Sequence, residues 1–283
     1  MATTQAAAPA AKNAAKAKGT SSIGIKDAIW VIVVCAVIAF CNFFFNFGSA
    51  SNFEGGDPDG GSPLNIWGTI FKGGIIVPVI HTLLLTVLCM CIERVIALSK
   101  CIGKEKLATF VGKIKKDIKA KDFDAALKDC DKQGGSVANV VRAAVMAYKE
   151  ADATTGIKKE VKMARIQQAH EEAIAVEMPT LTMNLPIIAT IVTLGTLTGL
   201  LGTVVGMIKS FQALAQGGGG DSVELSAGIS EALINTAFGI GTSWLAVVGY
   251  NFFTNRIDKI AFALDEIGYS IAQTYAATHT DEA

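Results

Sequence analysis

Residues 185–208 read LPIIATIVTLGTLTGLLGTVVGMI, and this stretch contains no charged residue. A helix needs roughly 20 consecutive apolar residues to cross a hydrocarbon core about 30 Å thick. The stretch meets that requirement and therefore predicts a membrane-spanning helix. It decides the class of fold, because backbone that crosses lipid has to satisfy its own hydrogen bonds.

Three further blocks are similarly apolar and long enough to cross a membrane: residues 28–47, 74–92 and 225–253. Apolar residues make up 51% of the 283-residue chain and charged residues only 18%, and the charges are concentrated between the blocks. The sequence therefore predicts an all-α, polytopic helical membrane protein with four spans. Apolar and charged residues alternate at helical spacing in residues 94–184, which predicts long helices that extend from the membrane into the cytoplasm.

The Lys and Arg residues indicate how the four spans are oriented. If every block crosses the membrane, all 25 of these residues except Lys72 and Lys209 fall on the same side. Cytoplasmic segments are the ones that carry such an excess. We therefore expect cytoplasmic N- and C-termini, with a disordered cytoplasmic tail (1–27), a loop on the opposite side (48–73), a cytoplasmic helical region (94–184) and a cytoplasmic tail (254–283).

The first block also has an alternative interpretation, as a cleaved signal peptide with Gly48-Ser49-Ala50 as the small-residue site. Its apolar stretch is long for that role and the tail before it is extended, which favours an uncleaved span. After it, residues 49–63 are rich in Gly, Ser and Asp and are expected to be flexible.

Composition and motifs argue against several classes of function. The net charge is zero, so nothing predicts binding to nucleic acid, and the six cysteines lie in apolar blocks or the Lys-rich region, where free thiols are expected. His170-Glu171-Glu172 is not a zinc-binding H-E-x-x-H motif, and Gly217 to Gly220 lack the Lys-Ser/Thr of a phosphate loop. We expect no catalytic site, metal or cofactor.

Block 185–208 carries small residues along one face. Glycines recur four, three and four positions apart, and in lipid such a stripe allows helices to approach closely. The stripe predicts helix packing within an assembled bundle, and its members are Gly195, Gly199, Gly202 and Gly206.

Block 225–253 contains Glu231, which lies about 15 Å beyond the D-x-x-E start signal at Asp221 and Glu224. A carboxylate inside the membrane is costly and predicts a functional site. Asn235 and Thr242 share its helical face. The alternative is an interfacial acid that reaches the outer water.

Other polar residues of the spans are weaker candidates. Thr236 and Ser243 lie on a face of the fourth block that adjoins the one with Glu231, so one broad side of that helix is polar. His81 stands alone in the second block, without a second metal ligand, and its role is left open.

Two strings carry a resemblance to a known family: GLLGTVVGMI at 199–208 and ISEALINTA at 229–237. Both resemble the ExbB/TolQ proton-channel family, with the MotA stators as looser relatives and ExbB as the nearest match. The likeness covers residues 74–253, and IER at 92–94, NLP at 184–186 and YN at 250–251 also fit. It implies one channel domain over that range, with spans at about 74–92, 185–208 and 225–253.

The resemblance also implies how the protein works. It implies a homopentameric pore in the lipid bilayer of a bacterial inner membrane, with residues 48–73 as a periplasmic loop. It also implies a single-span ExbD/TolR-like partner that passes through this pore, and a TonB-like protein. Thr203, Glu231 and Thr236 match the pore-lining positions of the proton pathway, with Asn235 and Thr242 as further polar candidates. The function implied is a proton-driven motor subunit that energises import through the outer membrane.

Two departures from the family pattern keep other functions open. Thr196 and Leu245 stand where family members often have proline, and residues 28–47 add a span to the usual three. Four spans resemble the layout of a MotA-like flagellar stator, whereas the Gly-Leu-Leu-Gly-Thr string favours ExbB or TolQ. A TolQ-like envelope-integrity motor and, from a different class, a purely structural scaffold are the alternatives, and a substrate transporter is disfavoured because related half-repeats are not apparent.

Overall fold

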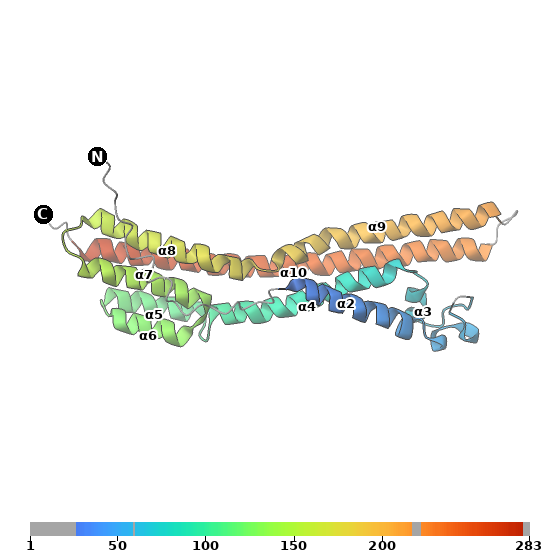
Figure 1. Cartoon of the computed structure of the whole chain (residues 1–283), viewed down its shortest axis with the longest axis horizontal. Coiled ribbons are helices and arrows are strands. Elements are labelled where there is room, and N and C mark those ends of the chain that lie inside the picture. The colour runs from blue at the N-terminus through green and yellow to red at the C-terminus, as the bar shows by residue number, and fades with distance from the viewer. Residues whose placement is uncertain (1–26, 59, 217–221, 280–283) are drawn as a thin grey trace, which may run out of the picture. The chain divides into compact units, whose positions relative to one another are not determined.

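The protein folds almost entirely into helices. The computed structural model describes residues 27–58, 60–216 and 222–279, and within these ranges the β-structure is limited to one isolated bridge between Phe53 and Pro63. The all-α class expected from the sequence is confirmed (Figure 1). The helices are α2 (Ala28–Asn42), a π-helical turn (Phe43–Phe47), 3-10 turns (Ala50–Asn52 and Glu54–Gly56), α3 (Ile66–Phe71), α4 (Ile76–Ile102), α5 (Leu107–Lys119), α6 (Phe123–Gln133), α7 (Gly135–Ala153), α8 (Lys159–Thr182), α9 (Leu185–Gln216) and α10 (Ser222–Thr278).

Four helical segments of the described chain are long and apolar enough to cross a membrane, which agrees with a multi-pass membrane protein. They are Ala28–Phe47, Ile76–Lys119, Lys159–Ala215 and Leu225–Thr278. Each of the last three extends well beyond its apolar block. The reason is that flanking Ala, Leu, Lys and Glu residues are good helix formers, so the helix does not end where the apolar run ends.

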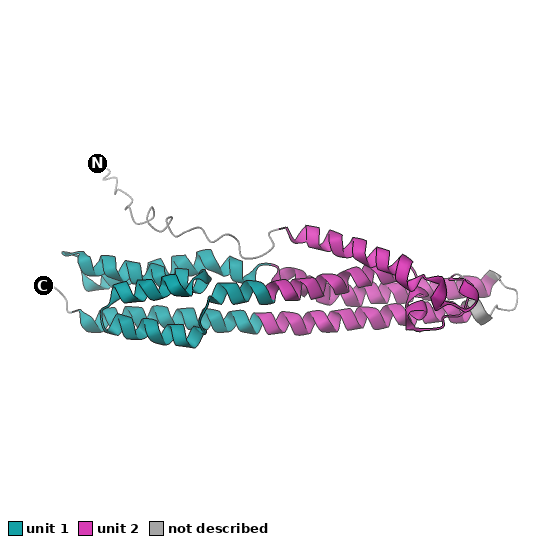
Figure 2. Cartoon of the chain, turned by 90° about the horizontal axis from the view of Figure 1, so that it is seen from below, with its two compact units in different colours: residues 1–25, 95–183, 254–283 teal, residues 26–94, 184–253 magenta. Residues whose placement is uncertain are grey.

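The described chain divides into two compact units, each built from segments that are distant in sequence (Figure 2). One unit contains residues 95–183 and 254–279, and the other contains 27–94 and 184–253. Helices α4 and α10 contribute to both. The four apolar blocks all belong to the second unit, which we call the membrane unit.

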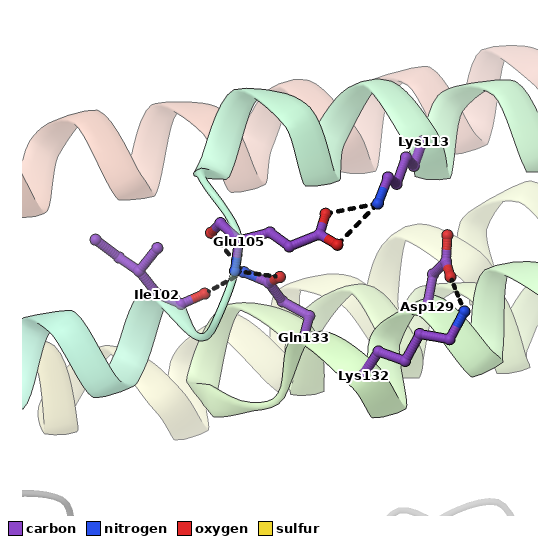
Figure 3. A network of polar contacts seen from close by, with 6 residues as sticks. All are labelled: Ile102, Glu105, Lys113, Asp129, Lys132 and Gln133. Carbon is purple, nitrogen blue, oxygen red and sulfur yellow. Dashed lines mark hydrogen bonds and ion pairs between the residues drawn. The ribbon is translucent and has the colours of Figure 1, made fainter.

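The first unit is a helical bundle of α5–α8 and the C-terminal part of α10. Its core is formed by fully buried side chains from each of these helices, including Ile114, Tyr148, Ile166 and Leu264. The turn between α4 and α5 is fixed by Gln133, whose amide donates to the carbonyls of Ile102 (2.7 Å) and Glu105 (3.0 Å), as Figure 3 shows.

The sequence predicts a tail after residue 253, whereas α10 continues without a break to Thr278. Buried apolar residues recur at three- and four-residue spacing along this extension, and they face the bundle of the first unit. This amphipathic stripe explains why the segment is helical, and it consists of Ile257, Ile260, Leu264, Ile267, Ile271 and Tyr275.

The segment after α2 is more structured than its Gly- and Ser-rich composition predicts. Phe53 is buried, Phe47 stacks on Trp67 (5.2 Å between ring centroids), and Phe43 stacks on Phe71 (4.8 Å). Asn52 donates hydrogen bonds to the carbonyls of residues 46 and 47. A small aromatic core thus folds a segment whose other residues favour turns.

Helix α2 packs on α4. The Cys35 and Cys89 sulfurs are 3.8 Å apart, and Asn42 Nδ2 lies 3.3 Å from His81 Nε2. His81, whose role the sequence does not indicate, therefore lies at the contact between α2 and α4. The tail that the sequence predicts to be disordered (1–27) lies outside the described residues except for Asp27, and so does the run from Gly217 to Gly220.

Candidate functional site

Helices α9 and α10 approach so closely that their backbones touch. A Cβ on Gly199 would lie 3.1 Å from the Gly239 Cα, and a Cβ on Gly206 would lie 2.7 Å from the Gly228 carbonyl oxygen. The four glycines of α9 singled out by the sequence all face α10, where Gly228 and Gly239 supply the matching small residues. Packing at this distance brings the polar side chains of the two helices into contact.

Thr203 on α9 and Thr236 on α10 meet at this crossing, and their hydroxyl groups are in hydrogen-bond contact. Each hydroxyl is also near a carbonyl of its own helix, at 3.3 Å from Gly199 O for Thr203 and 3.1 Å from Ala232 O for Thr236. A second pair, Thr196 and Ser243, is joined by a 2.8 Å hydrogen bond. The crossing thus holds two hydroxyl pairs between closely packed helices.

Glu231 is buried in the membrane unit and forms an ion pair with Lys209 of α9. The Lys209 ammonium donates to both carboxylate oxygens, at 2.7 and 2.9 Å. The Glu231 side chain is only 10% exposed, whereas that of Lys209 is 52% exposed. Burial of a carboxylate requires a partner of this kind, because an isolated charge in apolar surroundings is strongly unfavourable.

The other polar residues on the Glu231 face of α10 point to different neighbours. Asn235 is fully buried and donates to the Gly73 carbonyl (2.8 Å), in the turn before α4. Thr242 is buried and lines a shallow apolar cavity of about 320 Å³ together with Leu84 of α4 and Trp244. The structure therefore brings Thr203 to Thr236 and Glu231 to Lys209. Asn235 lies between Gly202 of α9 and the turn before α4, and Thr242 lies on the side of α10 toward α4.

This arrangement allows proton chemistry in a membrane helix pair. Thr236 follows Glu231 by about 7.5 Å of helix rise, so one acid and one hydroxyl pair lie along the same helix. Hydroxyl groups both donate and accept hydrogen bonds and can hold water beside a protonatable group.

The sequence profile of the MotA/TolQ/ExbB proton channel family matches residues 136–266 of this chain, a range that includes all of α9 and the described hydroxyl pairs. The match covers just under half of the chain, and over that range the chain is similar to this family. The similarity agrees with the expectation that the protein is not an enzyme, since the family is one of proton channels.

Individual members of the MotA/TolQ/ExbB family are similar to the chain over part of its length. The Tol-Pal system protein TolQ of Pseudomonas aeruginosa is 32% identical over 124 residues, which is 44% of this chain and 54% of that protein. An ExbB homolog of Methanothermobacter thermautotrophicus is 24% identical over 200 residues, 69% of this chain and 66% of that protein. The biopolymer transport protein ExbB of Salmonella typhimurium is 34% identical over 84 residues, 30% and 34% of the two chains. The matches thus span between a third and two thirds of these relatives.

Sequence reasoning missed Lys209 as a partner of Glu231. Lys209 directly follows the apolar block that ends at residue 208, so it is counted there as part of a loop, whereas α9 continues to Gln216. Had the helix been predicted to continue past residue 208, Lys209 would have been assigned to a helical face and could have been considered as a partner for Glu231. The Thr196–Ser243 pair was missed because the sequence does not show which hydroxyl of α9 faces Ser243 of α10.

Proposed function

We propose that this chain is the proton-channel subunit of an inner-membrane motor that uses the proton-motive force. It works with a single-span ExbD-like partner to energise TonB-dependent import across the outer membrane. In this role it forms a homopentamer around that partner, its channel domain is residues 74–253, and its N- and C-termini are cytoplasmic. The asymmetric placement of Lys and Arg supports this orientation.

The observation that carries the proposal is the contact between the Thr203 and Thr236 hydroxyls across the glycine-lined α9–α10 crossing. Burying a hydroxyl group between membrane helices costs free energy, and valine has the same shape without that cost, so the two threonines point to a polar role at this crossing. In the proposed pathway, these hydroxyl groups hold water near Glu231. Protonation of a carboxylate in such surroundings changes a charge that is costly enough to shift a helix.

A TolQ-like role in envelope integrity is the second candidate, favoured by the similarity to the Pseudomonas aeruginosa TolQ protein. A MotA-like stator is a further alternative, favoured by four apolar segments with the large charged region between the second and third. A structural scaffold, from a different class, would not conduct protons with any partner.

The sites are tested with Thr236→Val and Glu231→Ala in cells that depend on this protein for import. We expect import to be abolished while the level of assembled complex in native gels stays unchanged. Thr190→Val is the matched control, because Thr190 is exposed on the same pair of helices and donates only to the Pro186 carbonyl of its own helix (2.8 Å). Normal import in both site variants would overturn the assignment of these residues.

The choice between motors is tested by purifying the complex from membranes and identifying its partners by mass spectrometry. Recovery of a single-span protein with a membrane aspartate, together with a TonB-like protein, supports the import motor. A TolR-like partner without a TonB-like protein would favour TolQ-like activity, a peptidoglycan-binding subunit would favour a stator, and a homo-oligomer alone would favour the scaffold.

A further inference from the structure

The segment that precedes α4 contacts α10 on both sides of Asn235. We call residues 28–58 and 60–73 the N-terminal module. Phe43, Phe47 and Ile70 of the module form a buried apolar cluster with Val77 at the start of α4, and Ile234 and Phe238 of α10 pack against this cluster. The module therefore touches the helix that carries Glu231, one turn beyond the acid.

A hydrogen bond fixes the end of the module to the same place. Asn235 donates to the Gly73 carbonyl at 2.8 Å, and its side chain is fully buried. A buried hydrogen bond of this kind resists separation of the two groups, because each would lose its partner without gaining water. The turn at Gly73 and Gly74 is thus joined to α10.

The backbone of this turn also covers the ion pair. Gly74 has a φ of +74°, and a Cβ there would lie 2.5 Å from Glu231 Oε1 and 3.7 Å from Lys209 Nζ. Lys209 supplies the positive charge that faces Glu231 from α9. The charged residue of the turn segment, Lys72, is directed elsewhere, over the Phe53 ring at 5.6 Å.

We propose that the Gly73–Gly74 turn is a clamp that holds Glu231 against Lys209, and that the N-terminal module thereby controls the access of protons to Glu231. Lys209 and Asn235 are positioning residues in this arrangement: Lys209 fixes the carboxylate and Asn235 fixes the turn above it. The proposal rests on the proposed function, in which Glu231 takes part in the proton pathway.

The clamp explains how an additional span can act on a channel helix. The helix cannot carry Glu231 away from Lys209 while Asn235 remains bonded to Gly73 and the Gly74 backbone remains over the carboxylate. A displacement of the module would break both contacts together, since Gly73 and Gly74 are consecutive. The module then acts as a gate on the outer end of the α9–α10 pair.

The test measures access to Glu231 without requiring a partner or import. Dicyclohexylcarbodiimide adds to protonated carboxyl groups in apolar surroundings, and the rate of adduct formation at Glu231 is followed by peptide mass spectrometry in native membranes at one fixed pH. Glu177, which is buried in the other unit and accepts a hydrogen bond from Asn139 (2.8 Å), serves as the internal reference.

We expect slow modification of Glu231 in the unchanged protein. Asn235→Leu removes the hydrogen bond to the turn, and we expect modification to be about fivefold faster, the change that corresponds to one net hydrogen bond. Gly74→Ala inserts a Cβ against the carboxylate at a positive φ and is expected to act in the same direction. Lys209→Met is expected to increase the rate most, and Lys209→Arg to restore it.

The matched control is Gly241→Ala on α10, where a Cβ would meet nothing within 4 Å, and its modification rate should equal that of the unchanged protein. If Asn235→Leu and Gly74→Ala both leave the rate unchanged while the complex remains assembled, the clamp is overturned. The proposed function is tested separately: normal import with both Thr236→Val and Glu231→Ala would overturn the assignment of the proton pathway, even if the clamp variants behave as expected.

Discussion

His170 is a titratable side chain that the bundle of the first unit holds in apolar surroundings. It lies on α8 with its imidazole against Gly268 of α10, where an added Cβ would contact the ring, and it is 6% exposed. Burial lowers the pKa of His170 below its ordinary value of 6.5, and the Leu264 carbonyl, Asp265 and Glu171 only partly oppose this shift. The folded unit therefore favours the neutral ring.

This lowered pKa predicts a dependence of stability on pH. Below pH 6.5 the unfolded chain takes up a proton on His170 that the folded unit does not, so the stabilisation is complete above that pH and is lost as the pH falls through it. We expect the melting temperature to drop more between about pH 7.5 and about pH 5.5 in the unchanged protein than in His170→Gln. An equal drop in both proteins would contradict this assignment.

Cys130 is a buried cysteine of the first unit, and burial changes the pKa of its thiol. Burial raises the pKa of the Cys130 thiol to about 12. Because the thiolate is the reactive form, we expect Cys130 to remain unmodified by a maleimide in the native protein and to react after denaturation. Mass spectrometry of the α6 peptide measures this, with Lys121→Cys at an exposed turn as the positive control. Rapid modification of native Cys130 would show that the site is open.

The pairing of α9 with α10 depends on glycines that belong to both helices. A Cβ on Gly239 would lie 2.7 Å from the Gly199 Cα and 2.6 Å from the Gly195 carbonyl oxygen, so the helices would have to separate. Gly241, two residues further along α10, has open space at the same position. Gly239 is therefore required for close packing against α9, whereas Gly241 is not.

This contrast predicts opposite effects of the same substitution. Gly239→Ala is expected to destabilise the protein by about 1–3 kcal/mol through overpacking. Gly241→Ala is expected to be neutral or stabilising by up to about 1 kcal/mol, because alanine is the better helix former. Thermal unfolding of the two variants in the same detergent compares them, and equal stabilities would contradict the close contact between α9 and α10.

At the scale of the whole molecule, the proposed orientation of the chain rests on the distribution of its charges. Nearly all Lys and Arg residues fall in the tail, the region between the second and third apolar blocks and the C-terminal segment. The proposed orientation places the segment after α2 outside the cytoplasm and the bundle of α5–α8 inside it.

This orientation is tested with single cysteines in a cysteine-free background. We expect Ser51→Cys, which lies in the segment after α2, to react with a membrane-impermeant maleimide in intact spheroplasts. Lys121→Cys, in the turn between α5 and α6, should react only after permeabilisation. The reverse pattern would place the termini on the other side.

The sequence predicts the four apolar segments, the all-α class and the family, because each of these depends on local information. A span is set by the length of an apolar run, and the family resemblance is carried by two short strings at 199–208 and 229–237. Thr203 and Thr236 belong to those strings, so the sequence alone makes both of them candidates. Their contact with each other is not contained in either string.

The tertiary structure decides which residues meet across helices. Lys209 pairs with Glu231, and Gly73 accepts from Asn235, through the crossing and register of helices that are far apart in sequence. The continuation of α10 to Thr278 likewise depends on the bundle that its apolar stripe covers. Membrane crossing is a property of one segment and its solvent, whereas an ion pair or a clamp is a property of two or three segments, and only their packing brings those together.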